Sequence, residues 1–65
     1  MLAKKKVEQF LKINFPDFVK YDITENTDDY TMVILDYGKD KMRIKLQQSE
    51  DYKLLIRLID TQFLT

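Results

Sequence analysis

The chain has 65 residues, of which 45% are hydrophobic, and its 11 Lys and Arg residues balance its 11 Asp and Glu residues. A chain of this length forms one small domain, here residues 1–65, and its zero net charge provides no overall field to attract nucleic acid or an anionic membrane. It contains no His and no Cys, which excludes disulfides, thiol chemistry and the commonest zinc ligands and general bases. The longest apolar run, residues 32–35, is too short for a membrane span or a signal peptide, so we expect a cytoplasmic protein with no membrane contact.

The first predicted element is a helix over residues 2–13. Its apolar residues, among them Val7 and Leu11, recur with the spacing of one helical face. Asn14 is suited to cap the carboxyl end of this helix. Pro16 prevents its continuation, because proline lacks the backbone N–H and clashes with the preceding turn.

Three strands are predicted next, at residues 19–24, 30–37 and 41–47. The first and third alternate apolar and polar side chains, which is typical of half-buried strands. The second is rich in β-branched and aromatic residues and is apolar on both faces. Turn-forming residues at 25–29 and 38–40 separate the three. Such short connections favour an antiparallel meander, in which the third strand would be an edge.

The pairing of the second and third strands decides which side chains each face of the sheet presents. We expect a four-residue connection that pairs Tyr37 with Met42. A three-residue connection would instead bury the Asp36 carboxylate beside Met42, which is costly for an unpaired charge. The preferred pairing places Asp36 opposite Arg43 on the face away from the helices.

A second helix is predicted over residues 50–64. Ser49 is a favourable N-cap, and Glu50 and Asp51 suit the first turn of a helix. Five apolar residues follow with helical spacing: Tyr52, Leu55, Ile56, Ile59 and Phe63. The predicted fold is therefore α+β with the order α-β-β-β-α, a three-stranded antiparallel meander with both helices packed on one face.

Catalytic and metal-binding motifs are missing from the sequence. The acidic cluster of Glu25, Asp28 and Asp29 lacks the alternating oxygen ligands and central glycine of an EF-hand. The chain has a single glycine, which excludes a glycine-rich phosphate-binding loop. We therefore expect no enzyme activity, no metal and no cofactor.

Basic residues share one side of the third predicted strand, at Lys41, Arg43 and Lys45. They could form a track for the phosphates of a nucleic acid. Alternatively, they could protect a sheet edge, since lysines on an edge strand hinder pairing between sheets. We favour edge protection and expect nucleic acid to be the weaker of the two candidate partners.

The α-β-β-β-α order resembles the layout of double-stranded RNA-binding domains. Those domains carry a Gly-Pro-x-His loop between the first two strands and a Lys-Lys-x-x-Lys cluster opening the last helix. Here the corresponding segments read Glu-Asn-Thr-Asp-Asp at 25–29 and Ser-Glu-Asp-Tyr-Lys at 49–53, so the resemblance implies the fold alone. The layout is also similar to that of small phage-encoded inhibitors, including some anti-CRISPR proteins, although the zero net charge departs from their acidic, DNA-mimicking members.

The second predicted strand places an apolar row, Tyr30, Met32 and Ile34, on the sheet face that the helices leave open. Tyr and Met are enriched in the cores of protein interfaces, where Met adapts its shape to the partner. We expect this row to bind another protein or a second copy of the chain. Three cationic residues form the rim of the expected site: Lys20, Arg43 and Lys45. In the alternative interpretation, the amino-terminal segment or residues 15–18 fold over the row and make it part of the core.

These patterns together predict a small intracellular protein without enzyme activity that acts through protein–protein contacts. Residues with AT-rich codons far outnumber those with GC-rich codons, which indicates an AT-rich genome, such as that of a low-GC bacterium or one of its phages or plasmids. One candidate role is that of an accessory or inhibitor protein of a phage or other mobile element. The alternatives are a nucleic-acid-binding module that uses the sheet face, or a homodimeric structural module.

Overall fold

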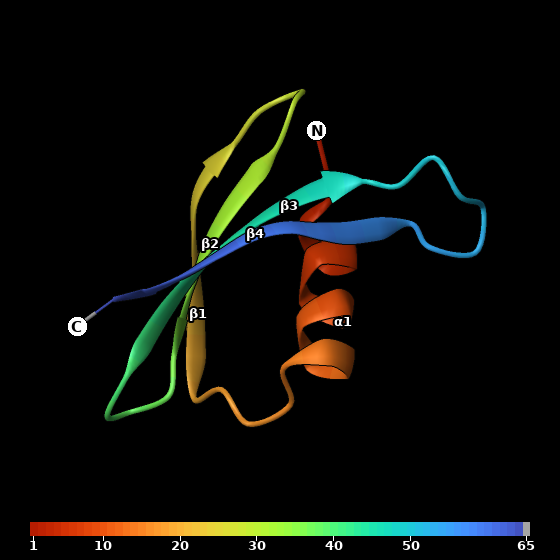
Figure 1. Ribbon diagram of the computed structural model, residues 1–65. Helices are drawn as coiled ribbons and strands as arrows, with labels where there is room; N and C mark the ends of the chain where they lie inside the picture. Colours follow the sequence, from red (N-terminus) through yellow and green to blue (C-terminus); the bar gives the residue numbers. More distant parts are fainter. Residues whose placement is uncertain (65) are drawn as a thin grey trace.

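A computed structural model describes residues 1–64 and shows one helix packed on one face of a four-stranded antiparallel sheet (Figure 1). The elements are α1 (Lys4–Asn14), β1 (Lys20–Asn26), β2 (Thr31–Asp36), β3 (Lys41–Gln48) and β4 (Ile56–Leu64). The strands lie in the sheet in chain order, β1-β2-β3-β4, so each strand pairs with the next through a hairpin. Within residues 1–64, no helix is long and apolar enough to cross a membrane.

The first helix forms where the sequence predicts it, within two residues at its start and one at its end. Val7 and Leu11 are fully buried and hold the helix on the sheet. The side-chain amide of Asn14 donates a hydrogen bond of 2.9 Å to the carbonyl oxygen of Phe10. This bond gives the Phe10 carbonyl, in the last turn of the helix, a side-chain donor and anchors Asn14 at the carboxyl end of the helix.

The core lies between α1 and the helix-facing side of the sheet. Its fully enclosed apolar side chains are Val7 and Leu11 of α1, Val33 and Leu35 of β2, and Ile44 and Leu46 of β3. Phe15 and Phe18, from the loop after α1, pack against this same cluster, as does Leu2. The segments that could have covered the opposite face of the sheet therefore lie on the helix side.

The predicted register between the second and third strands is wrong by two residues. Met42 lies opposite Leu35 and not opposite Tyr37. The four-residue connection is tightened by Gly38, at φ +90°, whose N–H donates to the Asp36 carboxylate at 2.8 Å. Because the error is an even number of residues, each side chain stays on the face that the sequence predicts.

The predicted second helix, residues 50–64, is also wrong, because this segment forms a loop and then β4. The residues expected to cap a helix form a tight turn instead. The Ser49 hydroxyl accepts the N–H of Asp51 at 3.0 Å, and the Asp51 carboxylate accepts the N–H of Lys53 at 2.9 Å. The loop is closed by the backbone N–H of Ser49, which donates to the carbonyl oxygen of Leu55 at 3.1 Å. Short polar side chains make such local bonds in turns as readily as at helix starts.

A β-bulge explains the helical spacing of the apolar residues in β4. Ile59 is an extra residue there, because Leu58 and Asp60 lie opposite consecutive residues of β3. The helix-facing residues are consequently Ile56 and Leu58 before the bulge and odd-numbered residues such as Phe63 after it. This change of phase breaks the two-residue alternation and produces a pattern that resembles a helical stripe.

Because β4 pairs with β3, the third strand is not an edge of the sheet. β3 is an interior strand, and the edges of the sheet are β1 and β4. The prediction that basic residues of the third strand protect a sheet edge is therefore wrong. The helix–three strands–helix order that suggested double-stranded RNA-binding domains and phage inhibitors is likewise not the order of the described chain, so both resemblances lose their basis.

Candidate interaction surface

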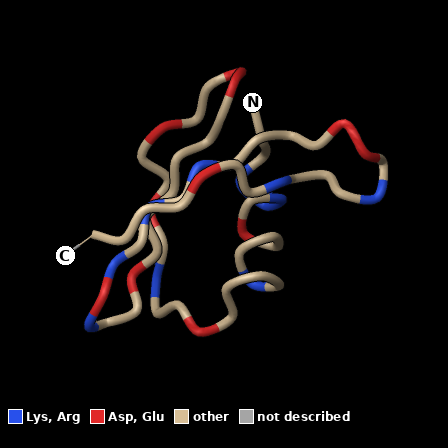
Figure 2. Tube along the Cα trace, in the orientation of Figure 1, with Lys and Arg blue, Asp and Glu red and all other residues tan. Residues whose placement is uncertain are grey.

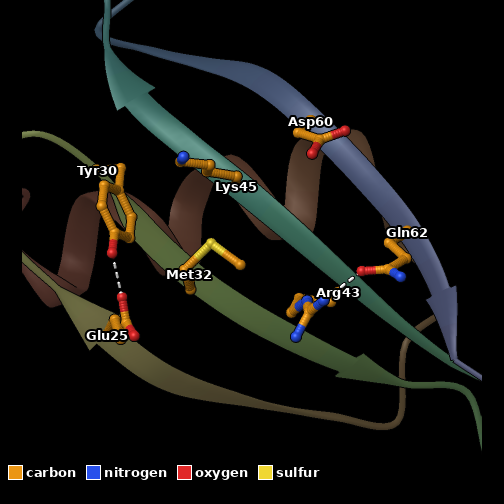
Figure 3. Close-up of a pocket in the computed structure, with 7 residues that line it drawn as sticks. All are labelled: Glu25, Tyr30, Met32, Arg43, Lys45, Asp60 and Gln62. Atoms are coloured by element: carbon orange, nitrogen blue, oxygen red, sulfur yellow. Dashed lines mark hydrogen bonds between the residues drawn. The ribbon is translucent and has the colours of Figure 1, made fainter.

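The predicted apolar row lies on the sheet face opposite α1. Met32 and Ile34 alternate with buried Val33 and are half-buried themselves, and neither belongs to the core cluster. Tyr30 directly precedes β2, and its ring lies beneath the Lys45 ammonium group, 4.4 Å from the ring centroid to Nζ (Figure 3). The structure therefore brings the row together on a surface outside the core.

Cross-strand pairing sets the rim of this surface. Arg43 lies opposite Ile34, and Lys45 lies opposite Met32, so both cations share the face with the apolar row. Lys20 lies at one end of the same face, where its Nζ is 3.8 Å from the carboxylate of Asp36. All six residues predicted from sequence thus lie on one face, in the relation that the predicted alternation requires.

A shallow hollow of about 320 Å³ occupies the middle of this face (Figure 3). Its lining residues are Glu25, Tyr30, Met32, Arg43, Lys45, Asp60 and Gln62. A second hollow, of about 360 Å³, lies nearer to the β2–β3 turn and includes Lys20 and Ile34. The six predicted residues are thus divided between two adjoining hollows, and the face offers broad contact rather than one deep pocket.

Hydrogen bonds hold the polar groups around the first hollow. The Tyr30 hydroxyl donates to the Glu25 carboxylate, and the Arg43 guanidinium donates to the side-chain oxygen of Gln62 (Figure 3). The bond to Glu25 raises the pKa of Tyr30 above its ordinary value, because it favours the neutral phenol and the nearby negative charge disfavours the phenolate. Tyr30 is therefore held in one orientation, with its ring contributing to the floor of the hollow.

Positive and negative groups alternate across the open face. The three cations of β3 form a column, but Asp36 lies opposite Lys41 on one side and Asp60 lies opposite Lys45 on the other. Figure 2 shows basic and acidic residues together at the β2–β3 turn and in the loop before β4, whereas the β1–β2 turn carries only acidic ones. Carboxylates beside the cations repel phosphates, so this arrangement suits a protein partner better than a nucleic-acid backbone.

The acidic side chains of the described residues do not gather into a metal-binding group. Within residues 1–64, no group of three or more acidic side chains is arranged to hold a metal ion. Of the acidic cluster in the β1–β2 region, Glu25 is engaged by Tyr30, whereas Asp28 and Asp29 lie in the exposed turn.

A second exposed apolar surface, which the sequence analysis placed in a helix, lies on β4 and the loop before it. The large hydrophobic side chains exposed there are Tyr52, Leu54, Leu55, Leu58, Ile59 and Phe63. Within β4, Ile56 is the one residue among 56–64 that is fully buried. A groove of about 310 Å³ continues this surface towards α1, where Phe10 and Ile13 line its other wall. The signal that could have found it is the alternation on either side of Ile59, which the bulge obscures.

Comparison with known proteins adds no further assignment. A scan against protein-family models, a search of curated proteins and a search of solved structures each find no match to this chain.

Proposed function

We propose that this protein is a non-enzymatic interaction module whose open sheet face binds a partner protein. The observation that carries the proposal is the position of Tyr30, Met32 and Ile34. They form an apolar row on the face opposite α1, while Leu2 and Phe18 pack in the core on the other side. An apolar row without a covering element is typical of a binding surface.

The composition of the face indicates the chemistry of the partner. Tyr30 provides a rigid aromatic contact and Met32 an adaptable one, as in the centres of many protein interfaces. Lys41, Arg43 and Lys45 form a cationic column beside this row, which favours a partner that carries acidic groups next to an apolar strip. We propose a cytoplasmic location as well, and the proposed origin in a phage or other mobile element rests on codon bias alone.

The test is a pair of double variants examined for folding and for partner capture. Met32→Thr with Ile34→Thr alters the open face, and Leu58→Thr with Phe63→Thr is the control on the β4 surface. Each is compared with the wild-type protein by thermal unfolding and by affinity capture from the source cell, followed by mass spectrometry. We expect the first pair to stay folded and to lose a protein that the wild type and the control retain.

Two results would contradict the proposal. If the open-face variant loses most of its stability, the row is part of the core and not a binding surface. If capture yields nucleic acid, and this binding weakens steeply as salt rises above about 150 mM, the cations of β3 contact phosphates instead. Apolar docking of a protein has a much weaker salt dependence.

A further inference from the structure

We infer that the edge of β4 is a self-association surface, on which the β4 strand of a second copy pairs antiparallel to form one continuous eight-stranded sheet. This surface is distinct from the open face of the proposed function. It consists of the unpaired backbone edge of β4 together with the exposed side chains of Leu58, Ile59 and Phe63.

The two edges of the sheet differ in their charged residues. β1 carries three charged residues among its seven, at Lys20, Asp22 and Glu25, which is a usual protection against further strand pairing. β4 carries only Arg57 and Asp60 among nine residues and contains neither lysine nor proline. One edge is therefore protected and the other is open.

Large apolar side chains of β4 are exposed to solvent. Phe63 lies opposite buried Met42 on the helix-facing side of the sheet, yet 75% of its surface is exposed. Leu58, opposite fully buried Leu46, also remains exposed. Figure 1 shows that α1 lies near the amino-terminal half of β4, whereas the carboxyl-terminal half extends away from the helix. Within the described chain, no other element covers these apolar side chains, so they are available to contact a second copy.

The β4 surface is complementary to a second copy of itself. In an antiparallel pair centred on Thr61, Phe63 lies opposite the bulge residue Ile59 of the partner subunit and next to Leu58 of the partner subunit, which the bulge brings onto the same face as Phe63. Asp60 then lies opposite Gln62 of the partner subunit, so the two Asp60 carboxylates do not oppose each other. The two-fold axis repeats every contact twice, as in most homodimers.

The size of the edge also fits a dimer. In a pair centred on Thr61, residues 58–64 of the two copies lie opposite each other, and seven residues at about 3.3 Å each give a shared edge roughly 23 Å long, about two-thirds of the 35 Å length of the whole molecule. A stable dimer buries about 800 Å² per partner, a minor part of the 5006 Å² accessible surface of the chain. Because only one edge is open, pairing stops at two copies and does not continue into a fibre.

The test measures mass in solution for the wild type and two matched variants. Phe63→Lys places a charge at the proposed contact, and Val19→Lys makes the same change beside β1, at a residue that is 71% exposed. We expect light scattering between about 1 μM and about 1 mM, a range that covers weak and moderate dimers, to give twice the 7.9 kDa chain mass for the wild type. Val19→Lys should remain dimeric and Phe63→Lys should be monomeric with an unchanged circular-dichroism spectrum.

Amide hydrogen exchange of the wild type provides a second readout that needs no variant. Amides of β4 should become more protected as the concentration rises, while those of β1 should not. A wild-type mass of 7.9 kDa at every concentration, or a dimer that survives Phe63→Lys, would refute the inference. A dimer that is lost in Met32→Thr with Ile34→Thr but kept in Phe63→Lys would also refute it. The first two results would leave the binding of a different protein by the open face untouched, whereas the third would show that the open face binds a second copy of the chain, so the two proposals fail separately.

Discussion

Two isoleucines of β4 provide a direct test of how residues 56–64 are folded. Ile56 is 4% exposed and belongs to the core, whereas Ile59, at the bulge, is 39% exposed. If this segment were the helix that the apolar spacing suggests, both would lie on the same buried stripe. We therefore compare Ile56→Ala with Ile59→Ala, both in the Phe63→Lys background so that self-association does not contribute.

The expected costs follow from burial. Shortening isoleucine to alanine removes three carbon groups, each contributing about 0.8 kcal/mol when buried, and a closed site adds a cavity cost. Ile56→Ala should therefore lower the free energy of unfolding by about 3 kcal/mol. At Ile59 the loss should be about 1 kcal/mol, because part of the side chain is already in water and the space left behind is open to solvent.

Urea denaturation followed by circular dichroism measures both values. A domain of this size has a total stability of roughly 3–10 kcal/mol, so Ile56→Ala can unfold the protein outright. Ile56→Val, expected to cost about 1 kcal/mol, keeps the comparison measurable in that case. If Ile59→Ala proves as costly as Ile56→Ala, the placement of β4 and the reasoning built on its exposed face are wrong.

Three further measurements test other parts of the fold. Thr31→Val removes the buried hydroxyl that donates to Asn26 at 2.8 Å and should lower the free energy of unfolding in urea by about 1–2 kcal/mol. An unchanged free energy of unfolding would mean that this hydroxyl is exposed to water. Gly38→Ala should cost about 1 kcal/mol through its positive φ alone, since no other atom lies within 4 Å of a Cβ there, and Gly38→Asn should cost less. Glu25 raises the pKa of Tyr30 in the folded protein, so the Tyr30–Glu25 hydrogen bond stabilises the fold only while the phenol is neutral. This contribution to the free energy of unfolding is complete below the pKa of tyrosine in the unfolded chain, about 10, and is lost as the pH rises through the pKa of Tyr30 in the folded protein. Tyr30→Phe should flatten this alkaline loss, and parallel pH profiles of the two proteins would contradict it.

Local patterns in the sequence determine the first two-thirds of the fold. The helical spacing of Val7 and Leu11, the stop at Pro16 and the alternation through Val33 and Leu35 each depend on residues close together in the chain. The open face was predicted with its six residues because alternation assigns each side chain to a face. The error of two residues in the register left that assignment intact.

Whether residues 49–64 form a helix or a loop and a strand depends on their tertiary contacts. Ser49 and Asp51 can begin a helix or a turn, and the apolar spacing from Ile56 to Phe63 fits a helical stripe or a bulged strand. The choice depends on β3, whose apolar Ile44 and Leu46 face the core and whose backbone accepts β4 as a neighbour. Such pairing between strands is not visible in either strand alone, because it depends on backbone hydrogen bonds that any residue other than proline can make. For the same reason the sequence could identify the open face but could not identify which strand would form the exposed edge.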